Sequence, residues 1–259
     1  MAKAAEFKIV DFRLIFCIIG YMKNKIILHI DMNSYFASVE QQANPFLRGK
    51  SVGVCAYLSP NGCIIASSME AKEKGIKTGT KVRETKEIDP DIVLVENEPA
   101  KYRSTTEAIF KIFSEYTDTV EPYSIDEAFL NLSGWTESLE AAKRLGREIQ
   151  HRIKDEVGER LNCSVGISWT KWLAKFASDI APKKSVLTID NREKLNETLA
   201  GRPLIDAWGI NTRMEKRLNM LGIKNLMDLK NFSADKIRRA LGRYGYYLWA
   251  NVSGQIVSG

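Results

Sequence analysis

Few residues in this sequence could build a zinc site or a disulfide framework. Among its 259 residues there are only four cysteines and two histidines. They are Cys17, Cys55, Cys63 and Cys163, with His29 and His151. No two cysteines are spaced as Cys-x-x-Cys, which argues against a zinc site. Scattered cysteines in a chain of this length fit a reducing compartment, so we expect a cytoplasmic protein.

The sequence also lacks an uninterrupted apolar run that could cross a membrane. The apolar stretch at residues 9–22 contains Asp11 and Arg13, whereas a spanning helix needs roughly 20 apolar residues. The same charges interrupt what would be the core of a signal peptide, and no small-residue cleavage site follows. We therefore expect no membrane contact. Because Met22 precedes a polar Lys-Asn-Lys and a strand pattern, we interpret Met22 as the natural start and residues 1–21 as an N-terminal extension that is either upstream sequence or non-native.

What remains is the composition of an ordinary globular protein with a basic balance. Hydrophobic residues make up 44% of the chain, the formal net charge is +6, and the pI is about 9.0. The length leaves room for two or three small domains. A basic protein suits a polyanionic partner, although charge alone does not establish one.

The patterning predicts strands and helices in alternation, followed by helices alone. We expect strands over residues 26–30, 51–56, 63–67, 93–96 and 163–167, a strand over 120–131 interrupted at 124–127, and helices over 33–42, 69–74, 105–116, 139–157 and 170–180. From about residue 190 the pattern is helical. The order predicts an α+β domain with a small insert and then a helical domain.

Three carboxylates stand where apolar strands end or break. Asp31 follows the strand at 26–30, and Asp126 and Glu127 interrupt the apolar segment 120–131. An exposed strand end is one explanation for the adjacent pair. If instead all three meet at one sheet edge, their oxygens would suit Mg²⁺, which prefers a few carboxylates together with substrate phosphates. Two such ions about 4 Å apart activate an attacking hydroxyl and stabilise a leaving phosphate.

Three motifs resemble those of the Y-family, lesion-bypass DNA polymerases. They are IDMNSYFASVE at residues 30–40, YSIDEAFL at 123–130, and CSVGIS at 163–168 followed by LAKFASD at 173–179. Their order and spacing also match, and the resemblance runs from about residue 25 to the C-terminus. It implies that Asp31, Asp126 and Glu127 are catalytic and ligate two Mg²⁺ ions, with the carbonyl of Met32 completing one site.

The resemblance also implies contacts with a deoxynucleoside triphosphate (dNTP). Phe36 would be the steric gate that leaves no room for a ribose 2′-hydroxyl, although an aromatic residue in a helix more often belongs to the core. Tyr35 would pack under the nucleotide. Asn33 stands where many relatives have an aspartate that is not a required metal ligand, and we place it at the nucleotide.

The segment expected to grip the triphosphate departs from the family pattern. Met69 and Lys72 stand where relatives usually have Tyr-x-x-Arg. Lys72 supplies a point charge but no bidentate fork, and Met69 cannot donate a hydroxyl hydrogen bond. We therefore expect weaker or shared triphosphate binding. Lys183 follows Pro182, in a reversed order from the usual Lys-Pro, and is the second expected phosphate contact; a surface lysine without a role is the alternative.

The helical part resembles the thumb of these polymerases. Residues 204–223 are similar to a helix-hairpin-helix, whose backbone N–H groups bind DNA phosphates without regard to sequence; a generic helical hairpin is the alternative. The expected DNA contacts are Lys171, Lys175, Gly209, Asn211, Arg213 and Lys216. Relatives often have glycine at position 211, and asparagine tolerates the left-handed backbone that such a position requires. The cluster 238–245 is either a second backbone contact or a solvated helix end.

The resemblance implies a right-hand architecture and template-directed, error-prone synthesis on primer-template DNA. We expect a palm at residues 22–34 and 98–188, fingers at 35–97, and a thumb at 189–255, with the family's little-finger domain absent. The protein would be a monomer, and contact with the replication sliding clamp would need a C-terminal region that the chain lacks. A non-catalytic DNA-binding relative is the main alternative. A nucleotidyl cyclase is disfavoured because the acidic pair does not lie in a Gly-Gly-Asp-Glu-Phe-like turn.

Overall fold

The computed structural model describes residues 25–136 and 138–256. The expectations about the extension at residues 1–21 and the apolar stretch at 9–22 lie outside these residues. Within them, no helix has both the length and the apolar character that a membrane span requires.

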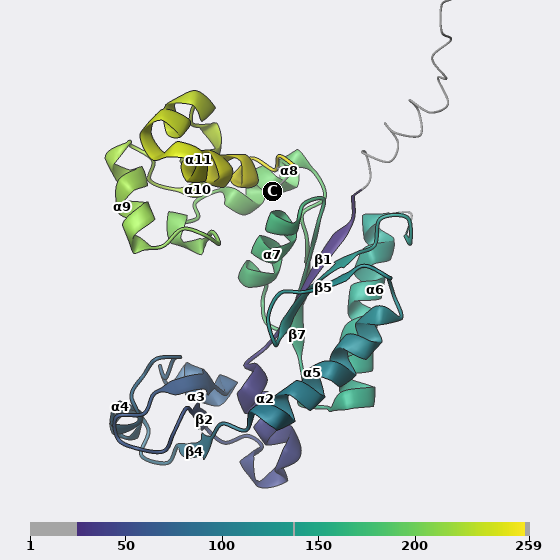
Figure 1. Ribbon diagram of the computed structural model, residues 1–259, viewed down its shortest axis with the longest axis vertical. Coiled ribbons are helices and arrows are strands. Elements are labelled where there is room, and N and C mark those ends of the chain that lie inside the picture. Colours follow the sequence, from purple (N-terminus) through teal and green to yellow (C-terminus); the bar gives the residue numbers. More distant parts are fainter. Residues whose placement is uncertain (1–24, 137, 257–259) are drawn as a thin grey trace, which may run out of the picture.

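A five-stranded mixed sheet forms the centre of the molecule (Figure 1). Its order is β5 (Val120–Pro122), β6 (Glu127–Asn131), β1 (Ile27–Met32), β7 (Cys163–Ser168) and β8 (Val186–Thr188). Strand β1 pairs antiparallel with both β6 and β7, and β7 pairs parallel with β8. The nearly continuous apolar run of β1 follows from this central place, because both of its faces are covered. Strand β8 was not predicted; it has only three residues, all half-buried.

Helices cover both faces of this sheet. Helices α5 (Pro99–Ser114) and α6 (Leu139–Arg152) lie on one face, and α7 (Lys171–Ile180) lies on the other (Figure 1). Helix α6 continues into a π-helical turn at Ile153–Val157. Glycine at position 166 allows α7 to pack directly on β7, because a Cβ there would lie 1.9 Å from the Ala174 carbonyl oxygen. Helix α5 begins six residues before the predicted start, at a proline suited to the first helical turn.

A second, smaller sheet is inserted between β1 and α5. Strand β2 (Val52–Cys55) pairs antiparallel with β3 (Ile64–Ser67) and parallel with β4 (Val93–Glu96). Around it lie α2 (Tyr35–Ala43), the 3₁₀ helix η1 (Pro45–Leu47), α3 (Met69–Glu73) and α4 (Val82–Ile88). Helix α4 was not predicted, because it buries only Val82 and Thr85 and so shows little apolar periodicity.

The C-terminal part is helical, as predicted. It comprises α8 (Arg192–Leu199), the 3₁₀ helix η3 (Leu204–Asp206), α9 (Thr212–Met220), α10 (Leu226–Asn231) and α11 (Ala234–Val252). Its apolar core is continuous with Trp172 and Phe176 of α7, which ties the helical part to the sheet. Helix α11 is kinked at Gly242, whose φ is 68°. The predicted α+β class is therefore confirmed.

Candidate active site at the end of the central sheet

Sheet pairing brings the three predicted carboxylates to one end of β1 and β6. Asp31 lies directly opposite Glu127 in the antiparallel register, and Asp126 immediately precedes β6. The backbone N–H of Met32 donates to the Asp126 carbonyl oxygen at 3.0 Å, which ties the two strand ends together. The predicted interruption at residues 124–127 thus falls mostly on the turn between β5 and β6, residues 123–126, and its last residue, Glu127, begins β6.

The surroundings of two of these carboxylates, Asp31 and Asp126, disfavour the charged form and raise the pKa. Burial raises the pKa of Asp31 to about 7, and the nearby charges of Glu127 and Asp126 add to this, although Lys183 opposes it. Burial and the charge of Glu127 also raise the pKa of Asp126. Buried like charges need a compensating cation. The donor chemistry of the pair therefore fits a divalent ion.

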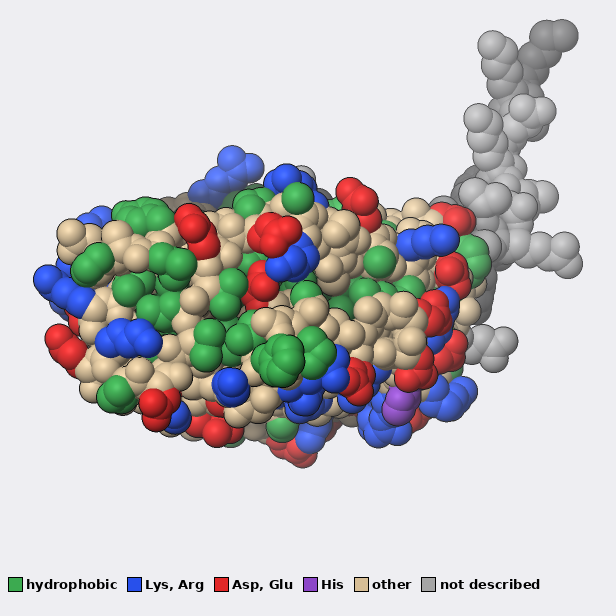
Figure 2. Space-filling model, turned by 90° about the horizontal axis from the view of Figure 1, so that it is seen from below, with side chains coloured by type: hydrophobic (Ala, Val, Ile, Leu, Met, Phe, Trp, Pro, Cys, Tyr) green, Lys and Arg blue, Asp and Glu red, His purple; other side chains and the backbone are tan. Residues whose placement is uncertain are grey.

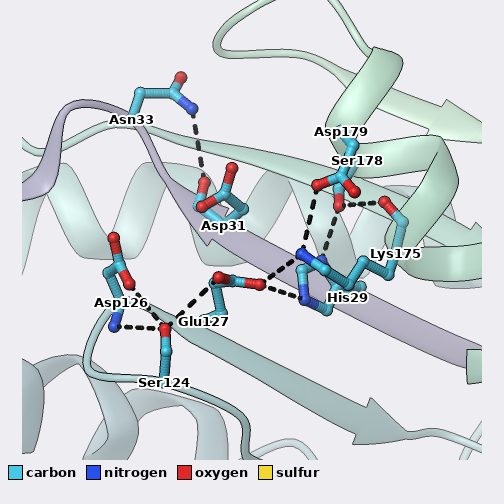
Figure 3. A network of polar contacts seen from close by, with 9 residues as sticks. All are labelled: His29, Asp31, Asn33, Ser124, Asp126, Glu127, Lys175, Ser178 and Asp179. Carbon is cyan, nitrogen blue, oxygen red and sulfur yellow. Dashed lines mark hydrogen bonds and ion pairs between the residues drawn. The ribbon is translucent and has the colours of Figure 1, made fainter. Parts of the chain in front are cut away.

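Glu127 is the exception, because positive and polar groups surround its carboxylate (Figure 3). His29 Nε2 lies 3.1 Å from Glu127 Oε2, and Lys175 Nζ donates to the same oxygen at 2.6 Å. These two neighbours lower the pKa of Glu127 to about 2, with His29 contributing most. Ser124 Oγ lies on the other side and donates to Asp126 Oδ1 at 2.6 Å.

A buried network behind Glu127 holds Lys175 and His29 in place. His29 Nδ1 lies 2.6 Å from Ser178 Oγ, and Ser178 Oγ donates to the Lys175 carbonyl oxygen at 2.8 Å. Lys175 Nζ also donates to Asp179 Oδ1 at 3.3 Å. The side chain of Lys175 is only 10% exposed. Its ammonium group is therefore held inside the carboxylate site, and the DNA contact predicted for Lys175 stays a prediction.

Asp31, Asp126 and Glu127 have the oxygen donors that suit Mg²⁺, but their side chains are not arranged around one point. In the described part of the chain, no three acidic, histidine or cysteine side chains are arranged around one point that could hold a metal ion. The reason is visible in Figure 3, where the carboxylate of Glu127 points toward His29 and Lys175. Asp31 and Asp126 supply the oxygen donors that Mg²⁺ prefers.

The two predicted aromatic nucleotide contacts differ in their exposure. Phe36 is half-buried and stacks on Tyr102, with 4.3 Å between the ring centres. Tyr35 is only 3% exposed, and its hydroxyl donates to the Tyr102 carbonyl oxygen at 2.9 Å. Tyr35 therefore packs in the core beside Phe36, and its predicted place under the nucleotide stays a prediction. Phe36 keeps a surface that can face a substrate.

Asn33 is also buried, and its side chain connects the loop at Lys184 with strand β7. It is 4% exposed, its Oδ1 accepts from the Lys184 backbone N–H at 3.0 Å, and its Nδ2 donates to Ser164 Oγ at 3.0 Å. Asn33 thus positions the loop that carries Lys183 beside Asp31. The nucleotide contact predicted for Asn33 stays a prediction beside this positioning role.

The expected triphosphate residues of α3 lie against the start of α2. Lys72 Nζ donates to Ser34 Oγ at 2.8 Å, and Ser34 Oγ donates to Met69 Sδ at 3.6 Å. Burial and the charge of Lys183 lower the pKa of Lys72, which places the two lysines on the same side of the site. Ser34 was not among the residues expected at the triphosphate.

Two side chains hold the hairpin of the helical part in place through hydrogen bonds to its backbone carbonyl groups. Gly209 has φ of 92°, and the Tyr244 hydroxyl donates to its carbonyl oxygen at 2.6 Å. Trp172 Nε1 donates to the Trp208 carbonyl oxygen at 3.2 Å. The first arm of the predicted helix-hairpin-helix is only the 3₁₀ turn η3. The left-handed position is Gly209.

Asn211 adopts a different conformation from the one expected. Its φ is −93°, and its Oδ1 caps α9 by accepting from the N–H groups of Arg213 and Met214. The prediction of a left-handed Asn211 is therefore wrong, because the side chain serves as an N-cap. Arg213 and Lys216 are exposed on α9. Lys171 is half exposed and forms an ion pair with Glu121.

Basic side chains do not form one continuous patch on the face that Figure 2 shows. On the face shown in Figure 2, basic and acidic side chains are interspersed with apolar ones. Near the kink of α11, by contrast, Arg238 and Arg243 lie over the rings of Tyr246 and Tyr247, at 5.7 Å and 5.8 Å.

Comparison with known proteins agrees with this geometry. A sequence model of the impB/mucB/samB family matches residues 30–179, which include all three carboxylates and, from the network behind them, Lys175, Ser178 and Asp179 but not His29. A DNA polymerase IV of Bacteroides fragilis is 33% identical over 231 residues, covering 88% of this chain and 62% of the relative. A DNA polymerase IV of Bacillus velezensis is 36% identical over 233 residues, covering 90% and 55%. The chain thus spans about three fifths of the length of these curated relatives.

Solved structures show the same fold. An insertion ternary complex of Dbh DNA polymerase superposes with a TM-score of 0.81 at 26% identity, covering 90% of this chain and 69% of that one. DinB from Sulfolobus solfataricus gives a TM-score of 0.79 at 25% identity, covering 90% and 68%.

Proposed function

Because the chain belongs to the impB/mucB/samB family, we propose that it is a template-directed DNA polymerase of the error-prone, translesion type. It would add deoxynucleotides to a primer 3′-hydroxyl, with attack on the α-phosphate and loss of pyrophosphate. The observation that carries this proposal is the meeting of Asp31, Asp126 and Glu127 at one end of the central sheet. Asp31 comes from β1, whereas Asp126 and Glu127 lie at the start of β6, much later in the chain.

The carboxylates would hold two Mg²⁺ ions, with the Met32 carbonyl completing one site. Bound there, the ions would activate the primer hydroxyl and stabilise the leaving phosphate. Lys175 and His29 hold Glu127 in one orientation beside Asp31, and Ser124 holds Asp126. For Glu127 to ligate an ion, its carboxylate would share its oxygens between the ion and its two neighbours, Lys175 and His29.

The nucleotide would lie between the start of α2 and α3. Phe36 would close the space that a ribose 2′-hydroxyl needs. Lys72 and Lys183 would face the triphosphate, and Asn33 would set the position of the Lys183 loop. Met69 adds no hydrogen-bond donor, so the grip on the triphosphate depends on other groups.

DNA would bind across the palm and the helical part. The hairpin with Gly209 and Asn211 would present its backbone to a phosphate, and Arg213, Lys216 and Lys171 would add charge; such contacts are independent of sequence. We assign the palm to residues 22–34 and 98–188, the fingers to 35–97 and the thumb to 189–255. A monomeric state, a cytoplasmic location and a clamp contact outside this sequence stay predictions.

Primer extension tests the proposal. With Mg²⁺, four dNTPs and low salt, we expect the parent and an Asp118→Ala control on the exposed surface to extend a primer, and Asp126→Ala to extend none. Equal extension by the parent and Asp126→Ala would reject the metal site.

The second candidate is a non-catalytic DNA-binding relative, which the altered residues Met69 and Lys72 favour. Such a protein would bind primer-template DNA but show no Mg²⁺-dependent dNTP binding and no extension. Measuring dNTP binding beside extension separates the two functions.

A further inference from the structure

Ser34 has an unusual backbone at the junction between β1 and α2. Its φ and ψ are 50° and 43°, and among the described residues Lys184 is the only other non-glycine residue with positive φ. Strained backbone of this kind persists where the surrounding structure enforces it, and it concentrates at ligand sites. Ser34 occupies the N-cap position of α2, yet its side chain makes no cap hydrogen bond. The hydroxyl is therefore not used to stabilise its own helix.

The side chain of Ser34 reaches instead to α3. Its Oγ accepts from Lys72 Nζ at 2.8 Å and donates to Met69 Sδ at 3.6 Å. A thioether is a weak acceptor, whereas a phosphate oxygen is a strong, charged one. The hydroxyl hydrogen is thus directed at a poor partner and can be transferred to a better acceptor without loss of a strong bond.

The surroundings of Ser34 favour a polyanion. Lys72 Nζ lies 2.8 Å from Ser34 Oγ, and the backbone N–H of Lys184, the residue after Lys183, donates to Asn33, the residue before Ser34. The Ser34 hydroxyl thus lies between a bound ammonium group and the loop that carries a second lysine, next to the strand end that carries Asp31. This is the chemistry that a triphosphate chelated by metal ions requires.

We propose that the Ser34 hydroxyl binds the triphosphate of the incoming nucleotide together with Lys72, replacing the hydroxyl that Met69 cannot supply. The inference rests on the proposed function, because it assigns a ligand to the same site. Ser34 is a substrate-binding residue in this scheme. Its contribution is specific to the triphosphate and does not extend to the base or the sugar.

The test compares Ser34→Ala with Ser104→Ala, a matched control on the exposed face of α5. Equilibrium binding of dATP and of dAMP is measured with Mg²⁺ and a primer that ends in a dideoxynucleotide, so that no bond forms. We expect Ser34→Ala to raise the Kd for dATP about tenfold, the effect of losing one hydrogen bond to a charged group, and to leave the Kd for dAMP within twofold. Thermal melting verifies that both variants fold.

Two results would overturn the proposal: an equal loss of affinity for dATP and dAMP, which would indicate a structural role, or no change in either. Met69→Tyr provides an independent arm. We expect it to restore dATP binding in the Ser34→Ala background and to add little in the parent. An equal gain in both backgrounds would show that the two hydroxyls do not substitute for each other, and would reject the inference.

Primer extension by the parent decides the proposed function separately. A parent that binds dATP through Ser34 but extends no primer would remove the polymerase proposal and leave the triphosphate site. A parent that extends primers while Ser34→Ala binds dATP normally would support the polymerase proposal and reject the role of Ser34.

Discussion

At the end of the central sheet, Asp31 and Glu127 are neighbours because β1 pairs with β6, whereas the hairpin at residues 207–211 is formed by one short stretch of chain. The sheet site is buried, and its charges interact strongly. The basic residues of the hairpin, Arg213 and Lys216, are exposed to water. The same kind of residue should therefore matter far more at the sheet than at the hairpin, since water and salt screen exposed charges.

Two lysines of α7 offer the sharpest form of this comparison. Lys175 is paired with Glu127 in the interior, and Lys171 is paired with Glu121 at the surface. We expect Lys175→Met to lower the free energy of unfolding by about 3 kcal/mol, because it leaves the half-buried Glu127 carboxylate without its ammonium partner and with only His29 beside it. Lys171→Met should cost less than about 1 kcal/mol. Urea unfolding at pH 7 measures both; equal losses would mean that Lys175 is not effectively buried.

The environment of Asp31 in the same site can be tested through the pH dependence of the free energy of unfolding. Its folded pKa of about 7 exceeds the ordinary value of 3.8, so between these values the folded state holds a proton that the unfolded state lacks. The stability of the parent without metal should therefore fall as pH rises from 4 to 7 and level off above pH 7.

Asp31→Asn removes this dependence, because asparagine does not titrate. We expect the variant to be more stable than the parent at pH 8 by roughly 2 kcal/mol, with the difference vanishing near pH 4. Urea unfolding across this range without Mg²⁺ provides the measurement. Adding Mg²⁺ should stabilise the parent and not the variant; parallel curves for the two proteins would contradict the assigned environment of Asp31.

The smallest effect is expected at the hairpin. Lys216→Ala should weaken DNA binding a few-fold, equally for unrelated sequences, and should reduce the slope of log affinity against log salt by about 1. Fluorescence anisotropy across a salt series measures both quantities. The control is Lys230→Ala, a half-buried lysine on α10 in the same helical part. A loss that depends on DNA sequence would argue against a phosphate contact.

Much of the carboxylate site could be predicted because its signals are local. A strand is recognisable from its apolar run, and an acidic residue at its end stands out against that run. This was enough to single out Asp31, Asp126 and Glu127, but an exposed strand end stayed open for the adjacent pair, and the expectation that all three act together came from the motif resemblance. The boundaries of α5 and the existence of α4 and β8 were harder, because these segments are short or carry few buried side chains.

Side-chain roles were predicted less well where a residue has two possible environments. Tyr35 and Phe36 are adjacent aromatic residues, yet one is buried and the other is half exposed. Lys171 and Lys175 lie one helical turn apart, yet only Lys175 enters the carboxylate site. His29 gave a faint signal as the single histidine in a buried strand.

The sequence by itself determined which residues are available to the chemistry: three carboxylates at strand ends, an aromatic residue after the first of them, and a basic helical region. Tertiary structure alone decided their partners. The contacts of Glu127 with Lys175, and of Ser34 with Lys72, join segments that are distant in the chain. The physical reason is that hydrogen bonding and burial depend on which elements pack together, and the local pattern of a helix or strand does not record its neighbours.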